Sequence, residues 1–396
     1  EDLPPGDPAP EVLDGRIWVD GCWDFFHHGH AGAMLQARQL GNELYVGIHS
    51  DEAILENKGP TVMTLEERVS AVEACRWVTK SVAYAPYVTS LPWITHYGCK
   101  YVVHGDDITS DSSGEDCYRF VKAAGRFKVV KRTPSISTTD LVGRMLLCTR
   151  THFIRSLVDV LAGKEGSGTD AERRAEGAAM AERMRLYATN ETGLQPGASV
   201  WTWAAPTQAA NSKGVFESLC EGLKPKPGQR VVYVDGGFDL FSSGHIEFLR
   251  QVIQAEEKLG RENGWYDEAA AQERVAKGGD YSPVFVIAGV HDDEEINHWK
   301  GVNYPIMNIY ERGMTSFIPL TYDPYTAPKE MGIYREIGQH AFANVNAGQI
   351  VERIMKSRAM YEERQRLKGV KGIGEAEKRR EEMEAEAAQR QKERST

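Results

Sequence analysis

The first third of the chain alternates short runs of β-branched, apolar residues with longer stretches of helical periodicity. Strand-like runs lie at 16–21, 43–50, 81–86, 101–105 and 128–132. Helical patterns lie between them at 29–41, 64–77, 88–98 and 115–126, and a further helix is expected after Ser137. Apolar strands that alternate with helices are typical of a parallel sheet covered by helices. Thr64, followed by Glu67, also predicts a capping box at the start of the second helix.

A second α/β pattern begins near residue 230 and repeats the first. The sequence "YVDGGFDLF" repeats "WVDGCWDFF", "IAGVHDDEEINHWKG" repeats "YVGIHSDEAILENKG", and "IMNIYERG" repeats "VMTLEERV". Asp20 and Gly47 are 27 positions apart, whereas the matching residues of the second copy, Asp235 and Gly289, are 54 positions apart. The second copy therefore carries an insertion. Further along, Arg68 and Tyr118 are 50 positions apart, whereas the matching residues Arg312 and Tyr325 are only 13 positions apart. The missing 37 positions hold the third and fourth strands of the first copy, so the second sheet is predicted to be truncated.

These patterns divide the chain into five parts. We predict a flexible arm at 1–15, a first domain at 16–150, a linker at 151–229, a second domain at 230–358 and a charged tail at 359–396. The linker is rich in Ala, Gly and charged residues, and the tail lacks a wide apolar face, so we expect the tail to be a solvated helix.

Composition narrows the class of protein. A hydrophobic content of 41% and a net charge of −10 indicate a globular protein without a general attraction to nucleic acid or anionic lipid. The six cysteines form no CxxC pair, which predicts reduced thiols and no zinc site. No run of eighteen apolar residues occurs, so we expect a cytoplasmic protein without a transmembrane segment.

The most informative motif is "HHGH", residues 27–30, between the first strand and the first helix. A helix N-terminus binds anions through its free N–H groups and its dipole, and Gly29 lets the backbone approach a phosphate closely. Imidazoles at His27 and His30, neutral or cationic, suit a reaction that builds negative charge on phosphorus. Taken alone, the match is four residues long and fits an ordinary polar helix start equally well.

Three further elements follow later strands of the first copy. Lys58 precedes a glycine after the second strand, and "HGDD" (104–107) follows the fourth. The run "KRTPSISTT" (131–139) places an Arg fork beside hydroxyls at a helix start, a second arrangement suited to phosphate. Because the carboxyl ends of parallel strands meet at one edge, these elements should converge, although each alone could be an ordinary surface lysine or helix cap.

Together these elements resemble the catalytic domain of the cytidylyltransferases in the HxGH nucleotidyltransferase superfamily. The two signatures of that family, HxGH and RTxGISTT, appear here as "HHGH" (27–30) and "RTPSISTT" (132–139). The tandem arrangement is similar to the branch of the family that uses phosphoethanolamine. The resemblance implies two Rossmann-like nucleotidyltransferase domains with parallel sheets in tandem, the second truncated and degenerate. It also implies transfer of a cytidylyl group from CTP to phosphoethanolamine, giving CDP-ethanolamine and pyrophosphate, a step of phosphatidylethanolamine synthesis.

The resemblance assigns roles residue by residue. The implied catalytic residues are His27, His30, Lys58, Arg132 and Thr133. The implied nucleotide-binding residues are Asp20, Gly21, Trp23, Asp24, Phe25, Gly29, Arg76, Trp77, His104, Gly105, Asp106, Ser137, Thr138 and Thr139. Substrate binding is assigned to Asp24, Lys58 and Asp107. No residue is assigned as a metal ligand, because Mg²⁺ is expected to arrive with CTP, held mainly by phosphate oxygens and water.

This sequence departs from the family pattern at two places in the first copy. Thr79 and Lys80 stand where an acidic pair is usual, and Pro134 and Ser135 replace the usual x–Gly. Neither departure removes a phosphate ligand, but both leave the contacts to the base open.

The second copy has lost most of its phosphate-handling residues. Ser242 stands for His27, whereas Gly244, His245 and Lys300 retain their types. The segment that matches "RTPSISTT" lacks the arginine, and "HGDD" falls within the missing positions. We therefore predict one active centre and a catalytically silent second domain, whose missing strands could reflect a splice variant or a mistaken gene model.

Several alternatives remain open from the sequence. A cytidylyltransferase for phosphocholine or glycerol phosphate, or an adenylyltransferase, would share the HxGH motif. Class I aminoacyl-tRNA synthetases share it too, but the chain has no KMSKS-type element. A non-catalytic regulatory variant is the alternative from another class. The resemblance allows a homodimer and peripheral association with the endoplasmic reticulum, and nucleic acid is not an expected partner.

Overall fold

A computed structural model describes residues 4, 6–204, 214–277, 279–301, 303–313 and 326–369. It divides into two compact units. The first unit contains residues up to Leu146, the short segment Asn190–Leu194 and the C-terminal residues from Ile350 onward. The second unit contains Leu147–Thr189 and Gln195–Gln349.

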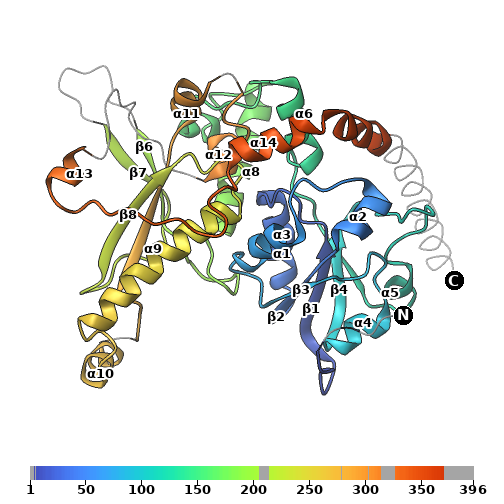
Figure 1. The fold of residues 1–396 in the computed structure, drawn as a ribbon, viewed down its shortest axis with the longest axis horizontal. Coiled ribbons are helices and arrows are strands. Elements are labelled where there is room, and N and C mark those ends of the chain that lie inside the picture. The colour runs from blue at the N-terminus through green and yellow to red at the C-terminus, as the bar shows by residue number, and fades with distance from the viewer. Residues whose placement is uncertain are drawn as a thin grey trace. The chain divides into compact units, whose positions relative to one another are not determined.

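The first unit is built on a five-stranded parallel sheet (Figure 1). Its strands are β1 (Leu13–Gly21), β2 (Glu43–Ile48), β3 (Lys80–Ala83), β4 (Cys99–Gly105) and β5 (Phe127–Val130). Their spatial order is β3-β2-β1-β4-β5, so the chain reverses its direction of growth between β1 and β4. Such a switch point opens a crevice at the carboxyl ends of the two strands, where open α/β sheets bind ligands. The predicted α/β fold with a parallel sheet is confirmed.

Helices connect the strands of the first unit. They are α1 (His28–Arg38), α2 (Asp51–Lys58), α3 (Leu65–Glu73), α4 (Leu91–His96), α5 (Arg119–Ala123) and α6 (Thr138–Leu147). The Thr64–Glu67 capping box at α3 is present as predicted. Helix α2 was not predicted; it starts at Ser50, whose side chain accepts a hydrogen bond from the N–H of Ala53. Its formation places Lys58 at the last turn of a helix.

The sheet separates two apolar clusters. Trp18 of β1 packs in one cluster with Val82 and Val102. Its neighbours Ile17 and Val19 pack in the other cluster. Because successive side chains of a strand point to opposite faces, this division shows that both faces of the central strand are covered. Burial on both faces explains why the strands read as continuous apolar runs.

The second unit contains a shorter parallel sheet and an antiparallel hairpin. Strand β8 (Arg230–Gly236) pairs with β9 (Val284–Val290) in parallel, and β6 (Val200–Ala204) pairs with β7 (Val215–Cys220) in antiparallel orientation. In the described part of this unit, the parallel sheet has two strands, in keeping with the predicted truncation. Its helices are α7 (Leu157–Leu161), α8 (Asp170–Tyr187), α9 (Ser243–Glu262), α10 (Glu268–Ala276), α11 (Asp293–Lys300), α12 (Ile309–Arg312), α13 (Thr326–Glu330) and the start of α14 (Ala347–Lys356).

The segment predicted as a linker, 151–229, is folded over much of its described length. Helix α8 carries Met180 and Met184, which pack in a cluster with Ile154, Leu157 and Cys220. The compact units therefore divide the chain at different points from the predicted domain bounds, which stay predictions. Within the residues described, no helix combines the length and the apolar character that crossing a bilayer requires.

Candidate active site

A pocket of about 220 Å³ lies at the carboxyl ends of β1 and β4, where the sheet changes direction. Most of the residues that the sequence assigned to the site line this pocket. They are Asp20, Gly21, Trp23, Asp24, His27, Gly29, His30, Lys58, His104, Gly105, Asp107, Arg132, Thr133, Ser137 and Thr138. Five assigned residues lie outside the lining: Phe25, Arg76, Trp77, Asp106 and Thr139.

The two histidines of "HHGH" form a hydrogen-bonded unit at the start of α1. His27 is the N-cap, and its Nδ1 accepts from the N–H groups of Gly29 at 3.1 Å and His30 at 3.4 Å. In return, Nδ1 of His30 accepts from the N–H of His27 at 3.4 Å, and the two rings stack with centroids 3.8 Å apart. Because both Nδ1 atoms act as acceptors, each neutral ring carries its proton on Nε2. His27 Nε2 is buried and has no protein partner among the described residues, so its N–H is free to bind a ligand oxygen.

Burial keeps these imidazoles neutral. Desolvation, reinforced by Arg132 and Lys58, lowers the pKa of His30 to about 3. Desolvation, together with the neighbouring His30, also places the pKa of His27 well below its usual range. The sequence allowed neutral or cationic rings, and the structure favours neutral N–H donors at neutral pH. Gly29 is required beside them, because a Cβ there would lie 2.8 Å from Cγ2 of Ile136 and 2.9 Å from the His27 ring.

This geometry predicts a defined tautomer for both rings. Nitrogen-15 chemical shifts of the imidazoles in the free protein at pH 7 should report neutral His27 and His30, each protonated at Nε2. His30 should remain neutral down to about pH 4, because its pKa is about 3. Addition of CTP should raise both pKa values, since a polyanion favours the charged ring. Cationic rings at pH 7 without nucleotide would contradict the hydrogen-bond arrangement.

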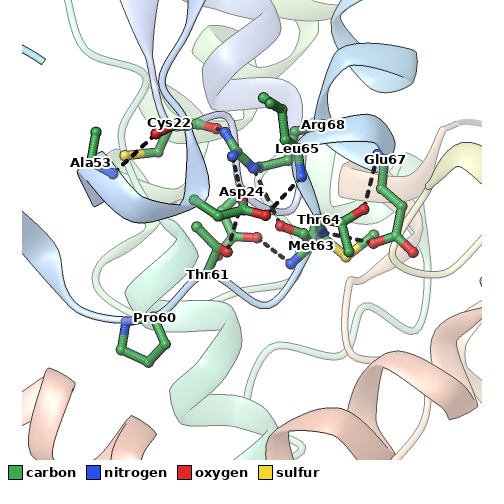
Figure 2. A network of polar contacts seen from close by, with 12 residues as sticks. Cys22, Asp24, Ala53, Pro60, Thr61, Met63, Thr64, Leu65, Glu67 and Arg68 are labelled. Atoms are coloured by element: carbon green, nitrogen blue, oxygen red, sulfur yellow. Dashed lines mark hydrogen bonds and ion pairs between the residues drawn. The ribbon is translucent and has the colours of Figure 1, made fainter. Parts of the chain in front are cut away.

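Asp24 holds the loop that follows Lys58 (Figure 2). Its carboxylate accepts hydrogen bonds from the N–H groups of Val62 at 3.0 Å and Met63 at 2.9 Å, and its side chain is 1% exposed. The residues on either side, Trp23 and Phe25, have φ values of 58° and 49°. This left-handed backbone is unusual for non-glycine residues and turns Asp24 inward. Asp24 was predicted to bind nucleotide and substrate, but its two oxygens already hold backbone, so we interpret it as a positioning residue.

Arg68 completes the same network. Its guanidinium donates to the carbonyl oxygens of Cys22 at 2.7 Å and Met63 at 3.3 Å, and to Oδ1 of Asp51 at 2.6 Å. Arg68 and Asp24 both bind the backbone of Met63, and Figure 2 shows the three residues together. Arg68 and Asp24 therefore hold the loop that follows Lys58 at Met63.

Polar groups from β4 and the loop after β5 face the histidines. Arg132 Nη1 lies 3.4 Å from Oδ2 of Asp107, and both side chains are about half exposed. This pair is weak because it is solvated, so an incoming phosphate can replace Asp107 as the partner of Arg132. Lys58 lies with its ammonium 5.8 Å from the ring centroid of Tyr87.

Asp20 was also assigned to nucleotide binding, but its carboxylate is engaged by hydrogen bonds within the protein. Its carboxylate accepts from Nε1 of Trp18 at 2.8 Å, from Oγ1 of Thr89 at 2.5 Å and from the hydroxyl of Tyr118 at 2.8 Å. These contacts tie β1 to the segments that flank β4. The side chain is buried, so Asp20 shapes the floor of the pocket.

Sequence reasoning missed two cations of the pocket, Arg364 and Lys368. They belong to a helix over residues 358–369, within the tail that we expected to be solvated. That expectation is wrong for this part, because Tyr361 is 5% exposed and its hydroxyl donates to the carbonyl of Thr61 at 3.1 Å. The spacing of Tyr361, Arg364 and Lys368 places them on one helical face, and this was the signal available in the sequence.

The second unit repeats the scaffold of the site. Asp239 accepts from the N–H groups of Ile306 at 2.7 Å and Met307 at 2.9 Å, as Asp24 does in the first unit. Arg312 donates to the carbonyls of Gly237 and Met307 and pairs with Asp293 at 2.6 Å, as Arg68 does. The two copies that were matched by sequence therefore share the same hydrogen bonds, donor by donor and acceptor by acceptor, in this network.

The start of α9 differs from the start of α1 in what packs against its glycine. At Gly244, which matches Gly29, a Cβ would collide with the carbonyl oxygen of Val345, and the carbonyl of Phe342 lies 2.9 Å away. The hydroxyl of Ser242 donates to the same Val345 carbonyl at 3.3 Å. Backbone oxygens of this segment therefore pack against Gly244, whereas the side chain of Ile136 packs against Gly29 in the first unit. A catalytically silent second unit stays a prediction from the sequence, in which Ser242 replaces His27.

Comparisons with known proteins agree with this geometry. The cytidylyltransferase-like family profile matches residues 18–144. The chain is 35% identical to the ethanolamine-phosphate cytidylyltransferase of Mus musculus over 404 residues, covering 90% of each protein. The chain belongs to the ethanolamine-phosphate cytidylyltransferase family. A relative with the same name in Dictyostelium discoideum is 35% identical over 90% of this chain and 95% of its own length.

Choline-phosphate cytidylyltransferases match over a smaller part of the chain. Choline-phosphate cytidylyltransferase 2 of Arabidopsis thaliana is 36% identical over 38% of this chain and 51% of its own length. Membership in the ethanolamine-phosphate cytidylyltransferase family and the cytidylyltransferase-like fold identify the protein as a nucleotidyltransferase enzyme.

Proposed function

We propose that the first unit transfers a cytidylyl group from CTP to phosphoethanolamine, giving CDP-ethanolamine and pyrophosphate. A phosphate oxygen of phosphoethanolamine attacks the α-phosphorus of CTP, and the bond from that phosphorus to the oxygen bridging the α- and β-phosphates breaks. The bond electrons leave with pyrophosphate. The observation that carries the proposal is the pair of neutral imidazole donors facing Lys58 and Arg132 across one pocket.

The residues act by positioning and by stabilising charge, because the reaction needs no covalent enzyme intermediate. The Nε2–H groups of His27 and His30 donate to phosphate oxygens as negative charge grows in the transition state. Arg132 binds the phosphate chain bidentately, and Lys58 lies between nucleotide and acceptor phosphate. A donor that is fixed before reaction, as His27 is by its hydrogen bonds, avoids the cost of reorganisation.

Mg²⁺ is proposed as the partner of CTP. The carboxylates of Asp20 and Asp24 are already engaged by hydrogen bonds, whereas Asp107 is half exposed in the pocket and can hold a hydrated ion. The ion would neutralise phosphate charge, coordinated mainly by phosphate oxygens and water. A homodimer, a cytoplasmic location and association with the endoplasmic reticulum surface stay predictions.

Substrate competition tests the acceptor. Purified protein with CTP and Mg²⁺ should release pyrophosphate with phosphoethanolamine, and kcat/KM should exceed that for phosphocholine by about tenfold or more. Three added methyl groups remove the N–H donors of the ammonium, and a site built to bind them discriminates strongly. Equal or faster turnover with phosphocholine would overturn the ethanolamine assignment while leaving the cytidylyltransferase chemistry intact.

A further inference from the structure

The helix over residues 358–369 contacts the catalytic pocket through one face. It is the dark red helix that follows α14 in Figure 1, and by its contacts it belongs to the first unit. Tyr361 anchors it to Thr61, and Nε2 of Gln365 donates to the carbonyl of Thr139 in α6 at 2.8 Å. Further back, Arg353 of α14 forms two 2.7 Å hydrogen bonds with the carboxylate of Glu67. These contacts fix the helix against both sides of the site.

Arg364 contacts the loop that follows Lys58. Its Nη1 donates to the carbonyl of Pro60 at 2.6 Å and lies 3.6 Å from Oδ2 of Asp24. A Cβ added at Gly59, which adopts φ of 87°, would lie 3.4 Å from Cγ of the same side chain. The loop after Lys58 is therefore held by Arg364 at Pro60 and by Asp24 at Val62 and Met63; Pro60 and Met63 are labelled in Figure 2. Arg364 therefore contacts both the loop and the carboxylate that holds it.

Lys368 brings a further ammonium group to the wall of the pocket. Its Nζ donates to Oγ1 of Thr139 at 2.5 Å, and the side chain lines the same pocket as His30 and Arg132. Although part of the side chain is exposed, desolvation, followed by the cations Lys58 and Arg364, lowers the pKa of Lys368 to about 8. Like charges gathered in one pocket repel each other until an anion binds among them.

We propose that Lys368 binds the phosphate chain of the nucleotide, so that the C-terminal helix supplies part of the active site. The proposal rests on the proposed function for the identity of the nucleotide. A triphosphate matches the cluster of Lys58, Arg132 and Lys368 in charge, and charge-assisted hydrogen bonds to phosphate are the strong ones. The contact of Lys368 with Thr139 also explains why Thr139, assigned to nucleotide binding from the sequence, faces the helix and not the pocket.

The test compares Lys368→Gln with Arg366→Gln in the full-length protein. Arg366 lies on the exposed side of the same helix and pairs with Glu363, so its variant controls for loss of one positive charge. In Lys368→Gln, the Kd for CTP and for inorganic tripolyphosphate should rise about tenfold, because one charge-assisted bond is lost. The KM for phosphoethanolamine should stay within twofold, and Lys368→Arg should restore most of the affinity.

Limited trypsin digestion gives a second measurement that does not depend on turnover. CTP or tripolyphosphate should slow cleavage after Arg364 and Lys368 in the wild-type protein, and should slow cleavage after Arg364 much less in Lys368→Gln. Equal tripolyphosphate affinities for the Lys368→Gln and Arg366→Gln variants, with unchanged melting temperatures, would overturn the proposal. Tighter CTP binding by Lys368→Gln would also overturn it.

The outcomes separate this proposal from the proposed function. A wild-type protein that binds tripolyphosphate through Lys368 but releases no pyrophosphate with phosphoethanolamine would refute the function and keep the inference. An active enzyme whose nucleotide affinity is unchanged in Lys368→Gln would refute the inference and keep the function.

Discussion

Replacement of His30 by alanine is expected to lower kcat by about 10²–10³-fold, whereas His245→Ala should change kcat by less than about twofold. Removing one prearranged donor to a developing oxyanion typically costs that much. His30 also holds His27 in place, because its Nδ1 accepts from the His27 N–H. Initial rates of pyrophosphate release at saturating CTP and phosphoethanolamine provide the measurement.

His245 is a matched control for this experiment. It occupies the same position on α9, its Nδ1 accepts from the N–H of Ser242 at 3.3 Å, and burial lowers its pKa to about 4. The two substitutions therefore remove similar buried rings, and melting curves should shift comparably. A folded His245→Ala protein with greatly reduced turnover would show that the second unit takes part in the chemistry.

The second large effect concerns Asp24. Asp24→Ala should destabilise the first unit by about 2–5 kcal/mol, because two buried N–H groups lose their acceptor. The loop from Lys58 to Met63 should lose its fixed position at the same time, so kcat/KM for CTP should fall even where the protein remains folded. Urea unfolding, followed with steady-state kinetics below the transition, measures both effects.

Asp239→Ala is the counterpart in the second unit. It strips the same pair of hydrogen bonds, from Ile306 and Met307, so the loss of stability should be similar. Catalytic constants should stay near those of the wild type at temperatures where both units are folded. If both variants lost activity in parallel with stability, Asp24 would have no role in the site beyond the fold.

The sequence predicted the sheet and most helices of the first unit because their signals are local. Continuous apolar runs between helical patterns identify a parallel sheet, and Thr64 with Glu67 marks a helix start within four residues. Helix α2 escaped prediction because it is short and has one buried residue, Ile54, among charged neighbours. Its apolar periodicity is therefore too weak to distinguish a helix from a loop.

The parts of the site that were not predictable depend on contacts between distant segments. Asp24 reads as a ligand beside "HHGH", and its true partners, Val62 and Met63, are about forty positions away. In the sequence, Lys368 is one of many charged residues of the tail, and only the folded structure shows that it contacts Thr139. Neither contact leaves a short-range pattern, since both depend on tertiary packing.

The repeated network of Asp24 and Arg68 has a consequence for how the two copies can be compared. The second copy keeps the Asp239 and Arg312 contacts, although Ser242 stands where the first copy has His27. A comparison of the two copies can therefore separate residues that the fold requires, which both copies keep, from residues that cytidylyl transfer requires, which only the first copy keeps.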